Sequence, residues 1–157
     1  MASLRPLVLA RWLALGVPVA LLGGAYFGQY FGGLYPCEMC WWQRYAHFAA
    51  LPFALLAFAT EPRRLWVLLA ALAVLASGLI GAFHAGVEYG WWEGFTTCSA
   101  TPLGSGDPLE ALMNAPLIRC DEVQWSLFGI SLAGFNFLIS TSGALAIFAL
   151  LARRASA

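Results

Sequence analysis

Long stretches without a charged residue divide the chain into four parts. These stretches cover residues 12–37, 45–60, 65–87 and 123–152, and most of their positions are apolar. A helix needs about 20 apolar residues to cross a hydrocarbon core of roughly 30 Å, so three stretches are long enough by themselves. The second is long enough only when its helix begins near Trp41, which brings Arg44 within about a turn of the membrane surface. The pattern predicts four helices over about 10–31, 41–60, 65–87 and 126–152.

Composition supports a membrane location. Of the 157 residues, 61% are hydrophobic and only 10% are charged, whereas a soluble domain carries about 25% charged residues. Eight acidic residues balance eight arginines, so the chain has no basic face for nucleic acid. We therefore expect an all-α membrane protein, a four-transmembrane-helix bundle that forms one integral membrane domain over 1–157, and exclude a soluble enzyme, a nucleic-acid binder and a disordered chain.

The arginines predict the orientation of these helices. Four crossings place both termini on one side, and six of the eight arginines lie on that side: Arg5, Arg11, Arg63, Arg64, Arg153 and Arg154. By the positive-inside rule that side is cytoplasmic, so the expected topology is N-in and C-in. A short loop over about 32–40 and a long loop over about 88–125 would then face the periplasm of a bacterial inner membrane.

The first stretch carries two further patterns. Arg5 and Arg11 before an apolar run resemble a signal peptide, but the run continues to Phe31, which is too long for a removed segment and favours a helix. Gly24, Gly28 and Gly32 recur every four residues, and such spacing lets helix backbones approach closely in lipid. We expect this stripe to lie at a helix–helix contact.

All four cysteines fall in the expected outer loops. Cys37 and Cys40 form a Cys-x-x-Cys pair at the start of the second helix, and Cys98 and Cys120 lie in the long loop. A structural disulfide suits Cys98 and Cys120, while a zinc site with four thiolates usually needs two closely spaced pairs. A redox relay is the third interpretation, because the N-terminus of a helix stabilises a thiolate. The relay needs no metal.

Arg44 favours the redox interpretation. It lies four residues after Cys40, on the same face of the expected helix, where its guanidinium could stabilise a Cys40 thiolate. The alternative is that Arg44 extends to the lipid headgroups. Because the chain contains no nucleotide, haem or iron–sulfur motif, a dithiol at the membrane boundary points to a lipid-soluble quinone as electron acceptor. The carboxylate of Glu38 is expected to raise the pKa of the adjacent Cys37 thiol.

Other polar residues in the apolar stretches are secondary candidates. His84 could lie beside the acceptor, where it would donate a hydrogen bond or relay protons, or it could be a neutral histidine bonded within the bundle. His47, one turn after Arg44, is a second candidate. Asn136, with Ser131 nearby, is expected to form hydrogen bonds between helices, and Gln43 has no assigned role.

Three segments together resemble the bacterial disulfide bond formation protein B (DsbB) family over almost the whole chain. The first is Cys37-Glu38-Met39-Cys40-Trp41-Trp42-Gln43-Arg44. The second is the run from Gly81 through His84 to Glu88, and the third runs from Cys120 through Trp125 to the Phe128-Gly129-Ile130-Ser131 string. A Cys-x-x-Cys alone is weak evidence, but these strings with two further loop cysteines and four helices are specific.

The resemblance implies a quinone-dependent thiol:disulfide oxidoreductase. The alternatives are a membrane scaffold with a structural disulfide and a metal-handling membrane protein. Its partner would be a periplasmic thioredoxin-like oxidase (DsbA), and its cofactor ubiquinone or menaquinone; we expect a monomer. Cys98 would form the mixed disulfide with the partner, and Cys120 would then attack Cys37. Cys40 would leave as the thiolate and pass electrons to quinone, with Arg44 and His84 at the quinone site.

Overall fold

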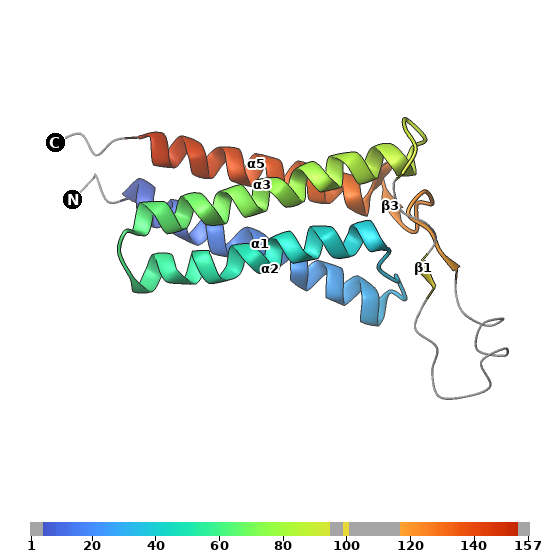
Figure 1. The fold of residues 1–157 in the computed structure, drawn as a ribbon, viewed down its shortest axis with the longest axis horizontal. Helices are drawn as coiled ribbons and strands as arrows, with labels where there is room; N and C mark the ends of the chain where they lie inside the picture. Colours follow the sequence, from blue (N-terminus) through green and yellow to red (C-terminus); the bar gives the residue numbers. More distant parts are fainter. Residues whose placement is uncertain (1–4, 95–98, 101–116, 154–157) are drawn as a thin grey trace.

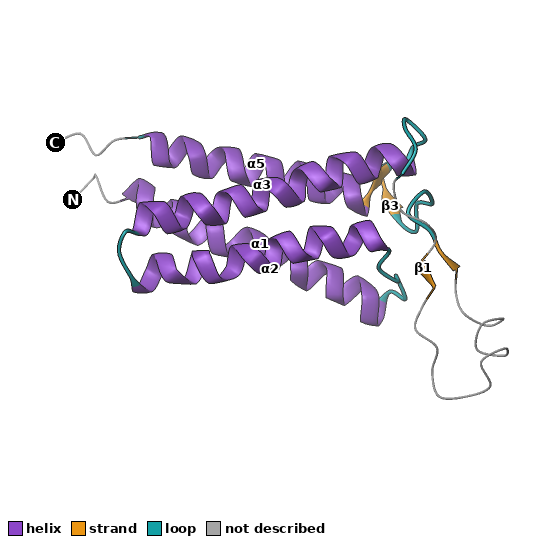
Figure 2. Ribbon diagram, in the orientation of Figure 1, coloured by secondary structure: helices purple, strands orange, loops and turns teal. Residues whose placement is uncertain are grey.

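The computed structural model describes residues 5–94, 99–100 and 117–153 of the chain. Its elements, shown in Figure 1 and by type in Figure 2, are the helices α1 (Arg5–Phe31), α2 (Glu38–Ala59), α3 (Arg63–Glu88) and α5 (Leu132–Ala152), and the short strands β1 (Ser99–Ala100), β2 (Leu117–Ile118), β3 (Ser126–Leu127) and β4 (Ile130–Ser131). β1 pairs antiparallel with β2, and β3 pairs antiparallel with β4.

The four helices form one bundle. α2 packs along α3, α3 packs along α5, and α1 contacts all three. In Figure 1 the start of α1, the end of α5 and the α2–α3 turn lie at one end, which we call the inner end, and the strands lie at the opposite, outer end. Among the described residues, α1, α3 and α5 are long and apolar enough to cross a membrane. α2 is not one of these three helices, and its first turns carry Glu38, Gln43, Arg44 and His47.

The last helix begins later than expected. Residues 126–131, which the pattern assigned to a helix over 126–152, form the β3–β4 hairpin, and α5 begins at Leu132. The two residues between these strands, Phe128 and Gly129, have φ values of 53° and 78°, and positive φ at both positions is typical of a type I′ hairpin turn. The Ser131 side chain then caps α5 by accepting a hydrogen bond from the backbone N–H of Gly134 at 3.1 Å. A short hairpin therefore interrupts this apolar stretch, in which no charge marks a boundary.

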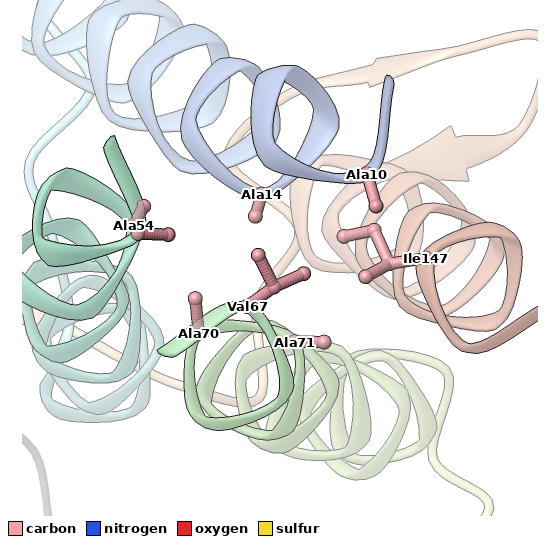
Figure 3. Close-up of a cluster of buried hydrophobic side chains, with 8 residues drawn as sticks. Ala10, Ala14, Ala54, Val67, Ala70, Ala71 and Ile147 are labelled. Carbon is pink, nitrogen blue, oxygen red and sulfur yellow. The ribbon is translucent and has the colours of Figure 1, made fainter. Parts of the chain in front are cut away.

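The inner end of the bundle has a core of small apolar side chains. Figure 3 shows this inner core, in which Ala14, Ala54, Val67 and Ile147 come from four different helices and are fully buried. Alanine has no side chain beyond Cβ, so the helices approach closely here and gain dispersion contacts from their backbones.

The glycine stripe of α1 does not form the expected close helix contact. A Cβ at Gly24 would meet no atom within 4 Å, and one at Gly28 would meet only the side chain of Leu34 at 3.2 Å. The close approach lies instead between α3 and α5. A Cβ at Gly78 would lie 2.7 Å from Oγ1 of Thr141, and one at Gly81 would lie 3.0 Å from the carbonyl oxygen of Ala133. The expectation was wrong because spacing alone does not tell which face of a helix meets a neighbour.

Candidate functional site

The Cys-x-x-Cys pair lies at the N-terminus of α2, as its position in the sequence predicted. Cys37 is the N-cap residue, and its Sγ accepts a hydrogen bond from the backbone N–H of Cys40 at 3.3 Å. The two Sγ atoms are 2.9 Å apart, so a disulfide of about 2.05 Å requires only a small approach. The positive end of the helix dipole lies at the same place and favours negative charge on either sulfur.

A histidine and a third cysteine meet this pair. Nε2 of His84, in α3, is 3.5 Å from Sγ of Cys37. The possible ligand atoms of Cys37, His84 and Cys120 all lie within 4.8 Å of one another, and the three side chains are buried. The fold therefore brings Cys37 and Cys120, which lie in different loops, close enough for thiol–disulfide exchange. Cys98, the fourth cysteine, lies outside the described residues.

The environment of Cys37 disfavours its thiolate. Hydrogen bonding to Cys120 and to Cys40, together with burial, raises the pKa of the Cys37 thiol above its ordinary range. The direction agrees with the expectation from the sequence, but the cause differs, because Glu38 is not among the groups responsible. Cys37 is 1% exposed, so the neighbouring sulfurs and the loss of water outweigh an adjacent carboxylate.

A cavity of about 260 Å³ lies beside the cysteines. Cys40, Arg44 and His84 line it, and on the α1 side its wall is formed by small residues such as Gly24 and Ala25. A cavity of about 150 Å³ is enough to bind benzene, so this one has room for a substituted single ring. The glycine stripe thus provides space beside the sulfurs.

The guanidinium of Arg44 is held by α1. Its Nη1 donates to Oε1 of Gln29 at 2.5 Å and its Nη2 to the carbonyl oxygen of Ala25 at 3.2 Å. The group also lies over the rings of Tyr26 and Trp41, at 4.8 and 5.1 Å from their centroids. A buried guanidinium needs strong acceptors, and carbonyl oxygens are stronger acceptors than a thiol sulfur.

The expected pairing of Arg44 with Cys40 is therefore not formed in this conformation. Among the described residues, no hydrogen bond joins the guanidinium to the sulfur, although both side chains line the same cavity. The role of Arg44 toward a Cys40 thiolate remains a prediction. Gln29 was not predicted from the sequence. The feature that could have identified it is that it carries the lone side-chain amide in the apolar stretch 12–37.

Polar side chains of three helices continue the site into the bundle. Gln43, which had no assigned role, hydrogen-bonds Nδ1 of His84 at 2.9 Å and accepts a hydrogen bond from Asn136 at 2.7 Å. His47 contacts Oδ1 of Asn136 at 3.0 Å. The expectation that Asn136 bonds between helices is confirmed, and the hydroxyl of Ser131, at the start of α5, also donates to Glu88 of α3.

Two kinds of ligand suit parts of this site. Two thiols and an imidazole within 4.8 Å are donors that zinc or copper accepts. The cavity beside Cys40 instead suits an uncharged ring, because its wall is mostly apolar and a few polar groups converge on it.

The sequence comparisons agree with the geometry. The family described as Disulfide bond formation protein DsbB matches residues 8–151 of the chain. The chain belongs to the DsbB family. As a DsbB-family member it is a multi-pass membrane protein and a disulfide-forming oxidoreductase, which confirms the resemblance identified from the three segments.

Individual relatives of this DsbB-family chain match over most of their length. A Disulfide bond formation protein B of Verminephrobacter eiseniae (strain EF01-2) is 34% identical over a 154-position alignment that covers 86% of this chain and 80% of that protein. A Disulfide bond formation protein B of Azoarcus sp. (strain BH72) is 31% identical over a 172-position alignment that covers 96% of this chain and 94% of that protein. No solved structure matches the chain.

Proposed function

We propose that this protein reoxidises a periplasmic thioredoxin-like oxidase of the DsbA type and passes the electrons through two cysteine pairs to ubiquinone or menaquinone. The observation that carries the proposal is the placement of Cys40 of the Cys37–Cys40 pair on a cavity, with the sulfur of Cys120 within 4.8 Å of that of Cys37. A structural disulfide in a scaffold needs neither this cavity nor a buried arginine beside it.

The electron path is a sequence of two exchanges. A thiolate of the reduced partner attacks Cys98 of a Cys98–Cys120 disulfide, a partner–Cys98 disulfide forms, and Cys120 leaves as the thiolate. Cys120 then attacks Cys37 of a Cys37–Cys40 disulfide, a Cys37–Cys120 bond forms, and the electron pair of the broken bond stays on Cys40. Exchange is fastest when the leaving thiolate is stabilised, and Cys40 lies in the first turn of α2, where the helix dipole supplies that stabilisation.

The cavity supports a quinone as the acceptor. A bound quinone supplies an electron sink that takes up two electrons and two protons and leaves as the quinol. Cys40 and Arg44 line the same cavity, so a rotation of the guanidinium toward the sulfur would direct its charge at a Cys40 thiolate or at a quinone oxygen. Until a thiolate or a quinone is present, the hydrogen bond to the side chain of Gln29 would hold the guanidinium in its observed position.

The arginine distribution supports N-in and C-in orientation, with both cysteine pairs at the periplasmic surface. The bundle is compatible with this arrangement because the start of α1, the end of α5 and the α2–α3 turn lie at its inner end (Figure 1). An oxidising compartment at the outer end is where disulfides persist.

The test is a turnover assay with purified protein in detergent, a reduced thioredoxin-like oxidase and a short-chain ubiquinone. Oxidation of the partner should require quinone, and Cys40→Ser should abolish quinone reduction while the loop disulfide still reacts once. Arg44→Ala should weaken quinone use without abolishing disulfide exchange.

Arg11→Ala is a matched control for Arg44→Ala. Arg11 also joins α1 to α2, through the carbonyl oxygen of Ala57 at 3.3 Å and the ring of Phe58 at 4.8 Å, but it lies at the inner end. It should leave the KM for quinone unchanged. Quinone-independent turnover, or equal kinetics of the two arginine variants, would contradict the proposal.

A further inference from the structure

A chain of buried hydrogen bonds connects the cysteines to the middle of the bundle. It runs from His84 through Gln43 to Asn136, and these side chains come from α3, α2 and α5. All three are at least nine-tenths buried. Because these side chains are shielded from bulk solvent, the direction of each bond is set mainly by the neighbouring protein groups.

A backbone carbonyl fixes the amide of Asn136. Its Nδ2 lies 3.0 Å from the carbonyl oxygen of Ser77, and a carbonyl can only accept, so the NH₂ group must be on that side. The opposite atom, Oδ1, accepts from the hydroxyl of Ser140 at 3.0 Å. The other N–H of Asn136 therefore points at Oε1 of Gln43, at 2.7 Å.

A second backbone carbonyl, that of Met39, fixes the orientation of the side-chain amide of Gln43. Its Nε2 donates to the carbonyl oxygen of Met39 at 3.2 Å, while its Oε1 accepts from Asn136. The same Nε2 lies 2.9 Å from Nδ1 of His84. Since Gln43 presents an N–H there, Nδ1 must be the bare, accepting nitrogen of the ring.

The imidazole is then neutral and carries its proton on Nε2. We propose that Gln43 and Asn136 are positioning residues that hold His84 as a neutral Nε2–H donor facing the sulfur of Cys37. Nε2 is 3.5 Å from that sulfur and 3.8 Å from Oε1 of Glu88.

The neutral Nε2–H tautomer is incompatible with two other roles of His84, as a metal ligand and as a proton relay. A metal ligand needs a bare nitrogen toward the metal and an N–H toward an outer acceptor, whereas Gln43 places the opposite polarity on the ring. A proton relay through the ring would require Nδ1 to take up a proton as Nε2 releases its own, and the amide N–H of Gln43 that faces Nδ1 is too weak an acid to supply one. The two thiols and the imidazole therefore form a hydrogen-bonded cluster around Cys37 and not a metal site.

The N–H of His84 acts at the later step of the exchange, in which Cys37 is released as a thiolate. This consequence rests on the proposed function. The second thiol of the partner attacks the partner–Cys98 disulfide, so that the oxidised partner leaves and Cys98 is freed as a thiolate. To restore the loop disulfide, this thiolate attacks Cys120 of the Cys37–Cys120 bond. A Cys98–Cys120 bond forms, and the electron pair of the broken bond goes to Cys37 as a thiolate. The N–H of His84 is placed to stabilise that buried anion.

Nitrogen-15 NMR of the full-length protein in detergent tests the tautomer directly, because ring nitrogens with and without a proton differ strongly in chemical shift. The chain has only two histidines, and a His47→Asn variant assigns the signals. We expect His84 to be Nε2–H at neutral pH. His47 should be the same tautomer, since its Nε2 faces the accepting Oδ1 of Asn136.

Gln43→Glu tests the positioning role. The carboxylate still accepts from Asn136 but cannot donate to Nδ1, so His84 should lose its Nε2–H tautomer and become protonated at Nδ1. Ser77→Ala is the control: its hydroxyl accepts from the side-chain amide of Asn136 and donates to the backbone carbonyl of Gln43, but its own backbone carbonyl remains to orient Asn136, so the tautomer should persist.

Two results would overturn the proposal: a bare Nε2 on His84 in the unmodified protein, or an unchanged Nε2–H tautomer in Gln43→Glu. The first needs no variant, so a folding defect cannot hide it. The measurement uses neither quinone nor partner, so its failure is distinguishable from failure of the proposed oxidase function, which the turnover assay reports separately.

Discussion

The inner and outer ends of the bundle are built in opposite ways. At the inner end, the buried residues are alanines with a valine and an isoleucine, and the helices meet through small apolar surfaces (Figure 3). At the outer end, Gln43, His84 and Asn136 are buried and joined by hydrogen bonds. Apolar contacts are non-directional, whereas a hydrogen-bonded chain admits one arrangement of donors. The inner end therefore holds the helices together, and the outer end sets the chemistry around the sulfurs.

The two arginines that join α1 to α2 show the same difference between the inner and the outer end. Arg11 and Arg44 each donate to a backbone carbonyl of the other helix and lie over an aromatic ring. Only Arg44 adds a side-chain acceptor, Gln29, and lines the cavity. The same structural contact thus occurs at both ends, and the outer copy is the one available to a ligand.

The largest effect should come from removing the centre of the polar chain. Asn136→Leu keeps the size of the side chain but leaves Oε1 of Gln43 and the N–H of His47 without their partner. Each buried polar group left unpaired costs roughly 1–3 kcal/mol, so the free energy of unfolding should fall by several kcal/mol. Denaturation in mild detergent measures it.

Ile139→Leu, on the exposed face of the same helix, is the control for that variant and should change stability by less than about 0.5 kcal/mol. If Asn136→Leu proved as stable as the unmodified protein, the outer end would not depend on its hydrogen bonds.

A smaller loss is expected from overfilling the inner core. Ala14 is fully buried against the other helices, and Ala14→Leu should destabilise the protein by about 1–3 kcal/mol through forced shifts of the backbone. Quinone-dependent turnover per folded molecule should not change, because the cavity lies at the other end. Val19→Leu, at an exposed position of α1, should have no effect on either property. A change in the KM for quinone with Ala14→Leu would show that the two ends are coupled.

The smallest effect concerns the pH dependence of one thiol. Alkylation needs the thiolate, and an unperturbed cysteine has a pKa of about 8.5. Because the pKa of Cys37 is raised, this residue should stay protonated and react slowly at pH values where an ordinary cysteine is largely ionised.

Mass spectrometry of the reduced protein after iodoacetamide treatment across pH 7–10 locates the label, with a Glu93→Cys variant supplying an exposed reference thiol. Labelling of Cys37 as fast as the reference at pH 8 would mean that its surroundings do not suppress the thiolate.

The positions of the helices followed largely from the sequence. Charge-free apolar stretches predicted four helices, and the structure has four among its described residues, with α2 beginning at Glu38 because Cys37 caps it. The start of α5 could not be read in this way, since the β3–β4 hairpin carries no charge or proline to mark it. The contact face of α1 was also misjudged, because a repeat of glycines does not identify its neighbour.

The candidate site was predicted in its residue types but not in its connections. The sequence motifs predicted Cys37, Cys40, Arg44 and His84 as site residues, because a thiol, a guanidinium and an imidazole each indicate a particular reactivity or charge. Gln29 and Gln43 carried almost no signal, since an amide in an apolar stretch has a partner only when another helix supplies one.

By itself, the sequence determined that this chain is a bundle of apolar helices with a dithiol at one helix start, because hydrophobic length and motif spacing are properties of the chain alone. Tertiary structure alone decided that Arg44 is held by α1 and that Gln43 orients His84 toward Cys37. The reason is physical: a hydrogen bond has a direction, and that direction is fixed only when the backbones of different helices bring particular donors and acceptors face to face.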